Sequence, residues 1–356
     1  MGLSFITRKT KKRDRVVAVD LGARSTKAVQ LQRRGDRITL LDFAIVDAPI
    51  FEKTLSVEAL SEHLRKVVAS LDGGRTKQIS VSIGVSETLF RQVEVPLMPV
   101  SDLRLMLKFN SKTYLQQELP DHVFDCCYVL SRAGQKFDGA KPAGTPKHKA
   151  LVGGVRKRTI DEMEAAVKGA GLVADQVVPG LIGPPNAFEL AEPELFAKEV
   201  VALVDIGFKH STITILDAGE IMLNRVVAIG GDRITAGLVE ALGVGYTEAE
   251  NIKIGMASEV QPSLELILNP LGRELRASID FFEHQQDKAV SQVLISGGSS
   301  RSEFIIQTLQ AELMVPCKTW LPTRSMELSL PPQKMGEIEQ IASQLTVAIG
   351  AAAAAL

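Results

Sequence analysis

One arrangement of residues occurs twice in this chain of 356 residues, once in each half. The first copy reads VAVDLGARSTKAVQL around Asp20, and the second reads ALVDIGFKHSTITIL around Asp205. In both copies an apolar stretch leads to Asp, an aliphatic residue and Gly, and a polar turn with Ser-Thr leads into an alternating stretch. A single Asp-x-Gly turn is common in hairpins, but two matching copies indicate two lobes built on one plan.

The chemistry of the repeated turn favours phosphate binding. Gly22 and Gly207 allow the backbone to approach a phosphate group closely, and the exposed amides of the turns can donate to its oxygens. An aspartate at the end of a buried strand can hold a water of hydrated Mg²⁺, an ion that takes few direct protein ligands. We therefore predict that Asp20 and Asp205 hold magnesium through water between the two hairpins.

The remaining apolar pattern alternates between strands and helices, which indicates an α/β fold. Residues 16–43 are typical of a strand followed by a meander, and residues 57–71 have helical spacing. Residues 200–206 are almost continuously apolar, as in central buried strands. The segments 293–296 and 304–313 predict a last buried strand and a helix, joined by a Gly-Gly-Ser turn.

The chain is too long for one ordinary compact core, so two lobes are expected. From Arg91 the character changes, with Pro96, Pro99 and two short strands, which predicts a subdomain inserted into the first lobe. The predicted segments are a basic N-terminal tail at 1–15, the core of lobe I at 16–90, the inserted subdomain at 91–155, more of the lobe I core at 156–197, lobe II at 198–329, and a C-terminal return to lobe I at 330–356.

Composition excludes several classes of protein. The formal net charge of -1 gives no field that would attract nucleic acid. The three cysteines contain no pair at metal-site spacing, and the five histidines form no His-x-x-x-His set. No signal peptide and no stretch of roughly 18–20 apolar residues is found, so we expect a cytoplasmic chain. Its basic tail, from Arg8 to Arg15, would add weak attraction to anionic lipid.

Phosphate hairpins in both lobes and a late Gly-Gly turn resemble the superfamily of actin, Hsp70 and the sugar kinases. The resemblance implies the actin-like ATPase fold, in which two lobes of mixed sheet and helices enclose a nucleotide cleft. It implies ATP or ADP with magnesium as the cofactor. It assigns to the nucleotide Asp20, Gly22, Ser25, Thr26 and Lys27 of the first phosphate motif, Asp205, Gly207 and Ser211 of the second, Gly231, and Gly297, Gly298 and Ser299 of the adenosine motif.

Two further stretches resemble the branch formed by the type IV pilus assembly family PilM and its relative FtsA. VEVPLMP at 93–99 is similar to the entry of the inserted subdomain that both share. GGDRITAGLVEALGVGYTEAENIKIG at 230–255 is similar to their helical segment after the second hairpin. The resemblance covers nearly the whole chain from Val16. It implies a nucleotide-binding scaffold of a type IV pilus-type, or related type II secretion-type, assembly machine, peripheral at the inner membrane through a partner.

The partner that the resemblance implies is a PilN-like single-span inner-membrane protein, bound through its cytoplasmic N-terminal peptide, together with other pilus-assembly components. Val93, Val95, Leu97 and Met98 form an apolar cluster at the entry of the inserted subdomain. Such a cluster could line a groove in which an extended peptide is added as a strand. Each of these residues is equally typical of an ordinary subdomain core. A homo-oligomer is a further open alternative.

The chain departs from the superfamily at both turns. Ala23 and Arg24 in the first turn, and Phe-Lys-His at 208–210 in the second, replace the small hydroxyl residues that are usual there. Residues 177–182 contain no acidic or Gln side chain, which these ATPases often use to orient the attacking water. Because positioning and electrostatics carry most phosphoryl transfer, we expect at most slow hydrolysis and assign no catalytic residue.

Two other functions compete with the scaffold. A membrane-associated filament former of the FtsA type needs an amphipathic C-terminal membrane helix, and the tail at 341–356 lacks the Lys/Arg-rich face of such a helix. A small-molecule kinase of the same superfamily needs a catalytic carboxylate beside the substrate hydroxyl. Beyond Asp20 and Asp205 the sequence offers no candidate for it.

Overall fold

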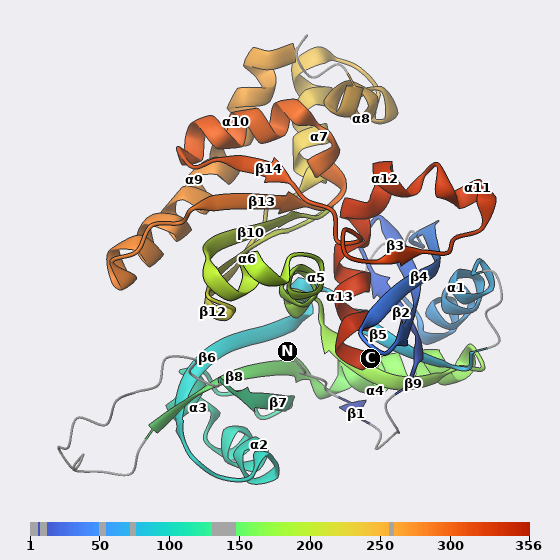
Figure 1. The fold of residues 1–356 in the computed structure, drawn as a ribbon, viewed down its shortest axis with the longest axis vertical. Coiled ribbons are helices and arrows are strands. Elements are labelled where there is room, and N and C mark those ends of the chain that lie inside the picture. Colours follow the sequence, from blue (N-terminus) through green and yellow to red (C-terminus); the bar gives the residue numbers. More distant parts are fainter. Residues whose placement is uncertain (1–5, 8–12, 50–54, 72–75, 130–146, 256–259) are drawn as a thin grey trace.

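A computed structural model describes residues 6–7, 13–49, 55–71, 76–129, 147–255 and 260–356. In this part of the chain, two large sheets with their helices lie on either side of a central helix, and a smaller sheet lies beneath them (Figure 1). We call the first sheet with its helices lobe I, and the second sheet with its helices lobe II. This arrangement has the α/β architecture expected from the sequence.

The sheet of lobe I has the order β1-β9-β5-β2-β3-β4-β15. Its strands are β1 (Ile6–Thr7), β2 (Arg15–Leu21), β3 (Ser25–Arg34), β4 (Arg37–Asp47), β5 (Gln78–Ile83), β9 (Val173–Pro179) and β15 (Glu327–Leu328). Helices α1 (Val57–Ala69) and α4 (Lys157–Gly169) cover one face. Val17 and Val19 point to that face and Ala18 to the other, so the apolar run of β2 is buried on both sides.

The sheet of lobe II has the order β12-β11-β10-β13-β14. Its strands are β10 (Val200–Ile206), β11 (Ser211–Asp217), β12 (Glu220–Val227), β13 (Gln292–Ser296) and β14 (Cys317–Thr319). Its helices are α7 (Gly231–Leu242), α8 (Tyr246–Gly255), α9 (Gln261–Gln286) and α10 (Glu303–Leu313). Because β10 pairs with β13 in parallel, their carboxyl ends reach the same edge of the sheet. The second hairpin and the Gly-Gly turn therefore lie next to each other.

A three-stranded sheet of order β6-β8-β7 lies between β5 and α4 in sequence. Its elements are η1 (Val85–Glu87), β6 (Thr88–Pro96), β7 (His122–Tyr128), β8 (Lys147–Arg156), α2 (Val100–Phe109) and α3 (Ser111–Leu115). Its core is separate from those of the large sheets and includes Val95, Leu103 and Phe124. We call this unit the inserted subdomain. The segment boundaries drawn from the sequence remain a prediction.

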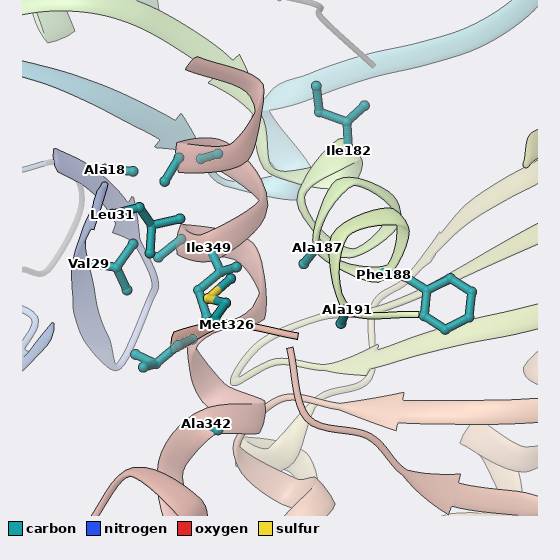
Figure 2. Packing of buried hydrophobic residues seen from close by; sticks show 14 of the residues in the cluster. Ala18, Val29, Leu31, Ile182, Ala187, Phe188, Ala191, Met326, Ala342 and Ile349 are labelled. Atoms are coloured by element: carbon teal, nitrogen blue, oxygen red, sulfur yellow. The ribbon is translucent and has the colours of Figure 1, made fainter. Parts of the chain in front are cut away.

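The C-terminal segment packs at the junction of the two lobes. Helix α13 (Thr346–Ala355) lies between the sheet of lobe I and α5 (Gly183–Ala191), and Figure 2 shows Ile349 between β3 and α5. The short elements around this junction are η2 (Gly180–Ile182), α6 (Pro193–Lys198), η4 (Gly298–Arg301), α11 (Pro332–Met335), α12 (Ile338–Ile341) and η5 (Ala342–Leu345).

The stretch Ile338–Ala355 corrects the expectation that no segment could span a membrane. By length and mean hydropathy these 18 residues could cross a bilayer. In the folded chain 56% of the stretch is buried inside the protein, where it completes the central core. Its apolar composition is therefore explained by packing between the two lobes.

Part of the basic tail is ordered against lobe I. Ile6 and Thr7 pair with Val177 and Gln176 at the edge of the sheet. The Arg13 guanidinium lies 3.7 Å from the Asp175 carboxylate. Most of the basic cluster, from position 8 to position 12, lies outside the described residues. The expected lipid contact of this segment stays a prediction.

Candidate functional site

The two repeated hairpins face a common cavity of about 500 Å³. Asp20, Gly22 and Lys27 line it from the first hairpin, and Asp205 and Gly207 line it from the second. Each aspartate lies at or near the carboxyl end of a central strand, β2 or β10. The folding of the two similar hairpins in opposite lobes thus brings together residues that are far apart in the sequence.

Asp20 is a buried carboxylate in a charged environment. Its exposed fraction is 8%, and the Lys27 ammonium lies 4.0 Å from its Oδ2. Burial raises the pKa of Asp20 to about 6, the positive charge of Lys27 lowers it, and the negative charge of Asp205 raises it. The ionised form is therefore costly unless a cation accompanies it. A hydrated magnesium ion would supply that positive charge.

Asp205 has a more specific partner. The Ser296 hydroxyl on β13 donates a hydrogen bond of 2.7 Å to its Oδ1. Burial raises the pKa of Asp205, while the hydrogen bond from Ser296 and the charge of Lys27 lower it. Within the described ranges, no group of three or more His, Cys, Asp and Glu side chains could hold a metal by itself. The two aspartates fit an ion that retains most of its waters.

The turn of the first hairpin leaves no space for a side chain at Gly22. A Cβ there would lie 2.5 Å from the Ser25 carbonyl oxygen and 2.8 Å from the Lys27 ammonium. Both distances are shorter than non-bonded atoms tolerate, so this position requires glycine. The absence of a side chain also exposes the turn to the cavity, as a phosphate-binding turn requires.

Two of the hydroxyl residues predicted to bind nucleotide, Thr26 and Ser211, have protein partners. The hydroxyl of Thr26 lies 2.7 Å from Nε2 of His63, which α1 supplies and which also lines the cavity. The hydroxyl of Ser211 donates to the Ile229 carbonyl over 2.7 Å. Neither Ser25 nor Ser211 lines the cavity. His63 was not identified from the sequence, because no motif or spacing connects it with the turn.

The predicted adenosine motif lies beside the cavity without lining it. Gly297 has a φ of 92°, which favours glycine, and a Cβ at Gly231 would lie 2.7 Å from the Ser299 hydroxyl and 3.5 Å from the Lys253 ammonium. Gly231, Gly297, Gly298 and Ser299 thus form one neighbourhood in lobe II. The lobe II half of the predicted site is clustered as expected, at the edge of the cavity.

Lys253 and Glu250 on α8 belong to the same neighbourhood and were not predicted individually. Lys253 is 2% exposed, and its ammonium donates to Glu250 over 2.7 Å and to the Thr235 hydroxyl over 2.9 Å. Burial alone would raise the pKa of Glu250, but its hydrogen bonds from Lys253 and Thr235 lower it below the usual value. This carboxylate therefore stays ionised. The sequence indicated these two residues only as part of the helical segment 230–255, which contains EAENIK.

The residues that depart from the superfamily pattern meet across the cavity. The Arg24 guanidinium of lobe I lies 5.5 Å from the ring centroid of Phe208 and 6.0 Å from that of Tyr246, both in lobe II. Its Nη1 is 3.6 Å from Oε2 of Glu250. The sequence identified Arg24 and Phe208 as unusual, but their contact depends on how the two lobes pack against each other.

The crossover into the second half contributes Gly180 to the cavity. Besides the two aspartates, the acidic side chains that line the cavity are Glu87 and Glu162. Glu162 forms an ion pair of 2.7 Å with Arg158 on the same helix. The position at which an acidic or Gln side chain was sought therefore offers only backbone to the cavity.

Solved structures of known proteins share this fold. The PilM-PilN type IV pilus biogenesis complex contains a chain that matches with a TM-score of 0.80 at 18% identity, over 96% of this chain and 98% of that chain. The ethanolamine utilization protein EutJ from Carboxydothermus hydrogenoformans matches with a TM-score of 0.56 at 15% identity, over 98% and 92%. MreB5 of Spiroplasma citri bound to AMPPNP matches with 0.52 at 9%, over 96% and 95%.

These likenesses establish the actin-like ATPase fold that the repeated hairpins predicted. The sequence comparison is more specific. The family model of the type IV pilus assembly protein PilM matches residues 18–355, almost the entire chain. The match includes both repeated hairpins, the inserted subdomain and the C-terminal helix. This chain therefore belongs to the PilM family of type IV pilus assembly proteins.

Proposed function

We propose that the chain is a cytoplasmic, nucleotide-binding scaffold of a type IV pilus-type assembly machine and that it binds the cytoplasmic tail of a PilN-like membrane protein. Membership of the PilM family supports the machine, and the PilM-PilN complex supports the partner. The observation that carries the nucleotide part is the shared cavity of Asp20 and Asp205. The proposed cofactor is ATP or ADP with magnesium.

In the proposed complex the two lobes share the nucleotide. Magnesium would be held through its waters by Asp20 and Asp205, and Lys27 would contact phosphate. Gly22 and Gly207 would let both turns approach the phosphates. The neighbourhood of Gly231, Gly297 and Ser299 would take the adenosine end. Ser25, Thr26 and Ser211 could serve through their backbone groups, since the hydroxyls of Thr26 and Ser211 already have protein partners.

Hydrolysis in this site would be slow. Magnesium, when bound, neutralises charge on the phosphates, and Lys27 adds a second positive charge. Orienting the attacking water requires a further acceptor. At the crossover that acceptor is missing because Gly180 has no side chain. The proposed role of the nucleotide is therefore to fix the relative position of the lobes, as a scaffold needs.

The proposed partner site is the open edge of the inserted subdomain. Among the described strands β6 pairs only with β8 and so forms one edge of the three-stranded sheet, where we propose that the partner peptide adds as a strand. Leu97, just after β6, is 66% exposed. Val95 is fully buried in the subdomain core, and Val93 and Met98 pack against that core. Of the four apolar residues expected to line a groove, Leu97 is therefore the one that we propose contacts the partner, together with the edge of β6.

The inserted subdomain also contacts lobe II. The Glu220 carboxylate at the start of β12 accepts from the Gln92 side chain over 3.3 Å and from the Lys149 ammonium over 3.2 Å. Strand β6 supplies Gln92 and β8 supplies Lys149. A nucleotide that changes the position of lobe II would therefore act on the strand proposed to receive the partner.

The test is the binding of a labelled synthetic peptide that copies the cytoplasmic N-terminal segment of a PilN-like protein from the same organism. Leu97→Asp is compared with Met314→Asp, which places the same charge on an apolar residue that is 84% exposed in lobe II. We expect at least a tenfold loss of affinity for Leu97→Asp and no change for Met314→Asp. Equal affinity for both variants would reject the β6 edge, and no binding with either ATP or ADP present would reject the partner.

A further inference from the structure

Arg24 reaches from lobe I into a fixed receptor on lobe II. Its side chain begins in the turn of the first hairpin, and its guanidinium contacts the rings of Phe208 and Tyr246 and the carboxylate of Glu250. The side chain is 46% exposed, so water reaches part of it. Three contacts from one residue thus join the two lobes at the cavity.

The residues that contact Arg24 are held in place by hydrogen bonds within lobe II. Glu250 is held by hydrogen bonds from Thr235 over 2.6 Å and from Lys253 over 2.7 Å. The Tyr246 hydroxyl donates to Asp232 over 2.7 Å. Because these partners all belong to lobe II, the hydrogen bonds of the receptor do not depend on Arg24. Arg24 itself lies on the turn of the first hairpin in lobe I.

The strength of the contact suits a reversible closure. Cation–π contacts and ion pairs at half-exposed sites are individually weak, because water competes for the charge. Arg24 makes two cation–π contacts and one ion pair. Together they favour the closed arrangement without locking it.

Arg24 lies beside the cavity, between residues that line it from the two lobes. Its neighbour Ala23 lines the cavity from lobe I, and Phe208 lines it from lobe II. The guanidinium lies 5.5 Å from the Phe208 ring and so bridges these two walls. A phosphate group is a stronger partner for arginine than a half-exposed carboxylate at 3.6 Å, because it accepts two parallel hydrogen bonds.

We propose that Arg24 is a gate: it holds the two lobes together when no nucleotide is bound, and the polyphosphate of an entering nucleotide takes the guanidinium from Glu250, which releases this contact so that the nucleotide can bind between the lobes. This inference rests on the proposed nucleotide-binding function and adds how that site is regulated. The alternative is a surface ion pair without effect on lobe position. The two differ in the chain without any ligand, where only the gate predicts that losing Arg24 opens the cleft.

The first experiment therefore needs no nucleotide. Spin labels are placed at Glu62→Cys on α1 and Glu240→Cys on α7, both exposed, in a chain whose three cysteines are replaced by Ala. Electron-spin distance measurements then compare the parent with Arg24→Ala, Arg24→Lys and Arg34→Ala. Arg34 is an exposed arginine on the same hairpin and serves as the matched control.

For the gate we expect Arg24→Ala to lengthen and broaden the distance distribution between the labels, Arg24→Lys to do so less, and Arg34→Ala to leave it unchanged. Phe208→Leu, which removes the ring, should reproduce part of the opening. A distribution for Arg24→Ala identical to that of Arg34→Ala overturns the proposal.

The second experiment uses the unlabelled chain with its native cysteines and fluorescent mant-ATP with magnesium in a stopped-flow mixer. Arg24→Ala should raise the association rate constant at least threefold, since the gate no longer has to open, and an unchanged constant counts against the gate. The two proposals can fail separately. Opening of the ligand-free cleft without any nucleotide binding would reject the proposed function alone, and nucleotide binding without opening would reject the gate alone.

Discussion

The two repeated hairpins share a sequence pattern but differ in how their aspartates are supported. Asp205 accepts a hydrogen bond of 2.7 Å from Ser296 on the neighbouring strand. Asp20 faces the Lys27 ammonium at 4.0 Å, a distance at which charge acts without a short hydrogen bond. Burial raises the pKa of both carboxyls. The second hairpin thus offsets part of the free-energy cost of burying an ionised carboxylate through its own hydrogen bond. The first hairpin leaves more of this cost to be offset by a bound cation.

The turns of the two hairpins also differ in their contacts. Ser211 of the second hairpin is fixed within lobe II, to the carbonyl of Ile229. Thr26 of the first is fixed by His63 from α1, and its neighbour Arg24 reaches the opposite lobe. We infer that the second hairpin is the rigid half of the site and the first is the half that responds to ligand. The predictions below test this difference in order of decreasing effect.

The largest effect is expected at Asp20. Replacing it by Asn removes a buried charge, so at pH 7.5 the nucleotide-free chain should become more stable by ~3 kcal/mol. Asp205→Asn should stabilise it less, because that variant also weakens the bond from Ser296. Urea unfolding of both variants at pH 7.5 and pH 4 measures the difference. Equal gains for the two variants would contradict the unequal support of the hairpins.

The pH dependence of this gain follows from the raised pKa of Asp20, about 6 in the folded chain. A raised carboxyl pKa stabilises the folded chain fully below the unfolded pKa, and this stability is lost as the pH rises through the folded pKa. The advantage of Asp20→Asn should therefore grow between about pH 4 and pH 6 and stay constant above. An advantage that is independent of pH would assign the gain to another cause.

The next effect concerns the anchor of the first turn. Thr26→Val leaves His63 without its hydroxyl partner and should cost about 1–2 kcal/mol, while Thr26→Ser keeps the hydroxyl and should cost less. Burial, followed by the charge of Lys66, lowers the pKa of His63. Neutral His63 therefore contributes to the stability of the folded chain above its unfolded pKa, and this contribution is lost as the pH falls below that value. Thermal unfolding of both variants between pH 5 and pH 8 provides the measurement.

The smallest effect is expected at Ser211. Ser211→Ala removes one hydrogen bond to the Ile229 carbonyl and should lower the free energy of unfolding by about 1 kcal/mol. Because the hydroxyl is directed at Ile229 within lobe II, nucleotide affinity should change by less than twofold. A large loss of affinity with unchanged stability would show that the hydroxyl turns toward the nucleotide instead.

The sequence predicted the fold through its repeated pattern. The Asp-x-Gly turns after buried apolar runs placed β2 and β10, and the match of the two copies indicated the actin-like pair of lobes. Helix α13 packs against β2, β3 and β5 of lobe I and against α5. The pairing of Ile6–Thr7 with β9 was not foreseen, because a two-residue strand has no periodicity.

The candidate site was predictable only where it follows a local motif. Asp20 and Asp205 could be connected because both lie in the same repeated pattern. The contact of Thr26 with His63 and that of Arg24 with Phe208 join residues from separate segments, and these contacts follow from tertiary packing alone. The hydroxyls of Thr26 and Ser211, assigned to the nucleotide by motif, have protein partners for the same reason. The sequence motif determines the backbone position of a residue, whereas tertiary packing determines which groups its side chain contacts.

Isothermal titration calorimetry of ATP with magnesium tests the central claim most directly, using the wild-type chain and the variants Asp20→Ala and Asp205→Ala. The account predicts binding to the wild type and at least a tenfold weaker affinity for each variant, because each removes one of the two carboxylates that face the cavity. Circular dichroism of the variants confirms that they remain folded. No binding to the wild type, or variants that bind as tightly as the wild type, would contradict the claim that the hairpins form one nucleotide site.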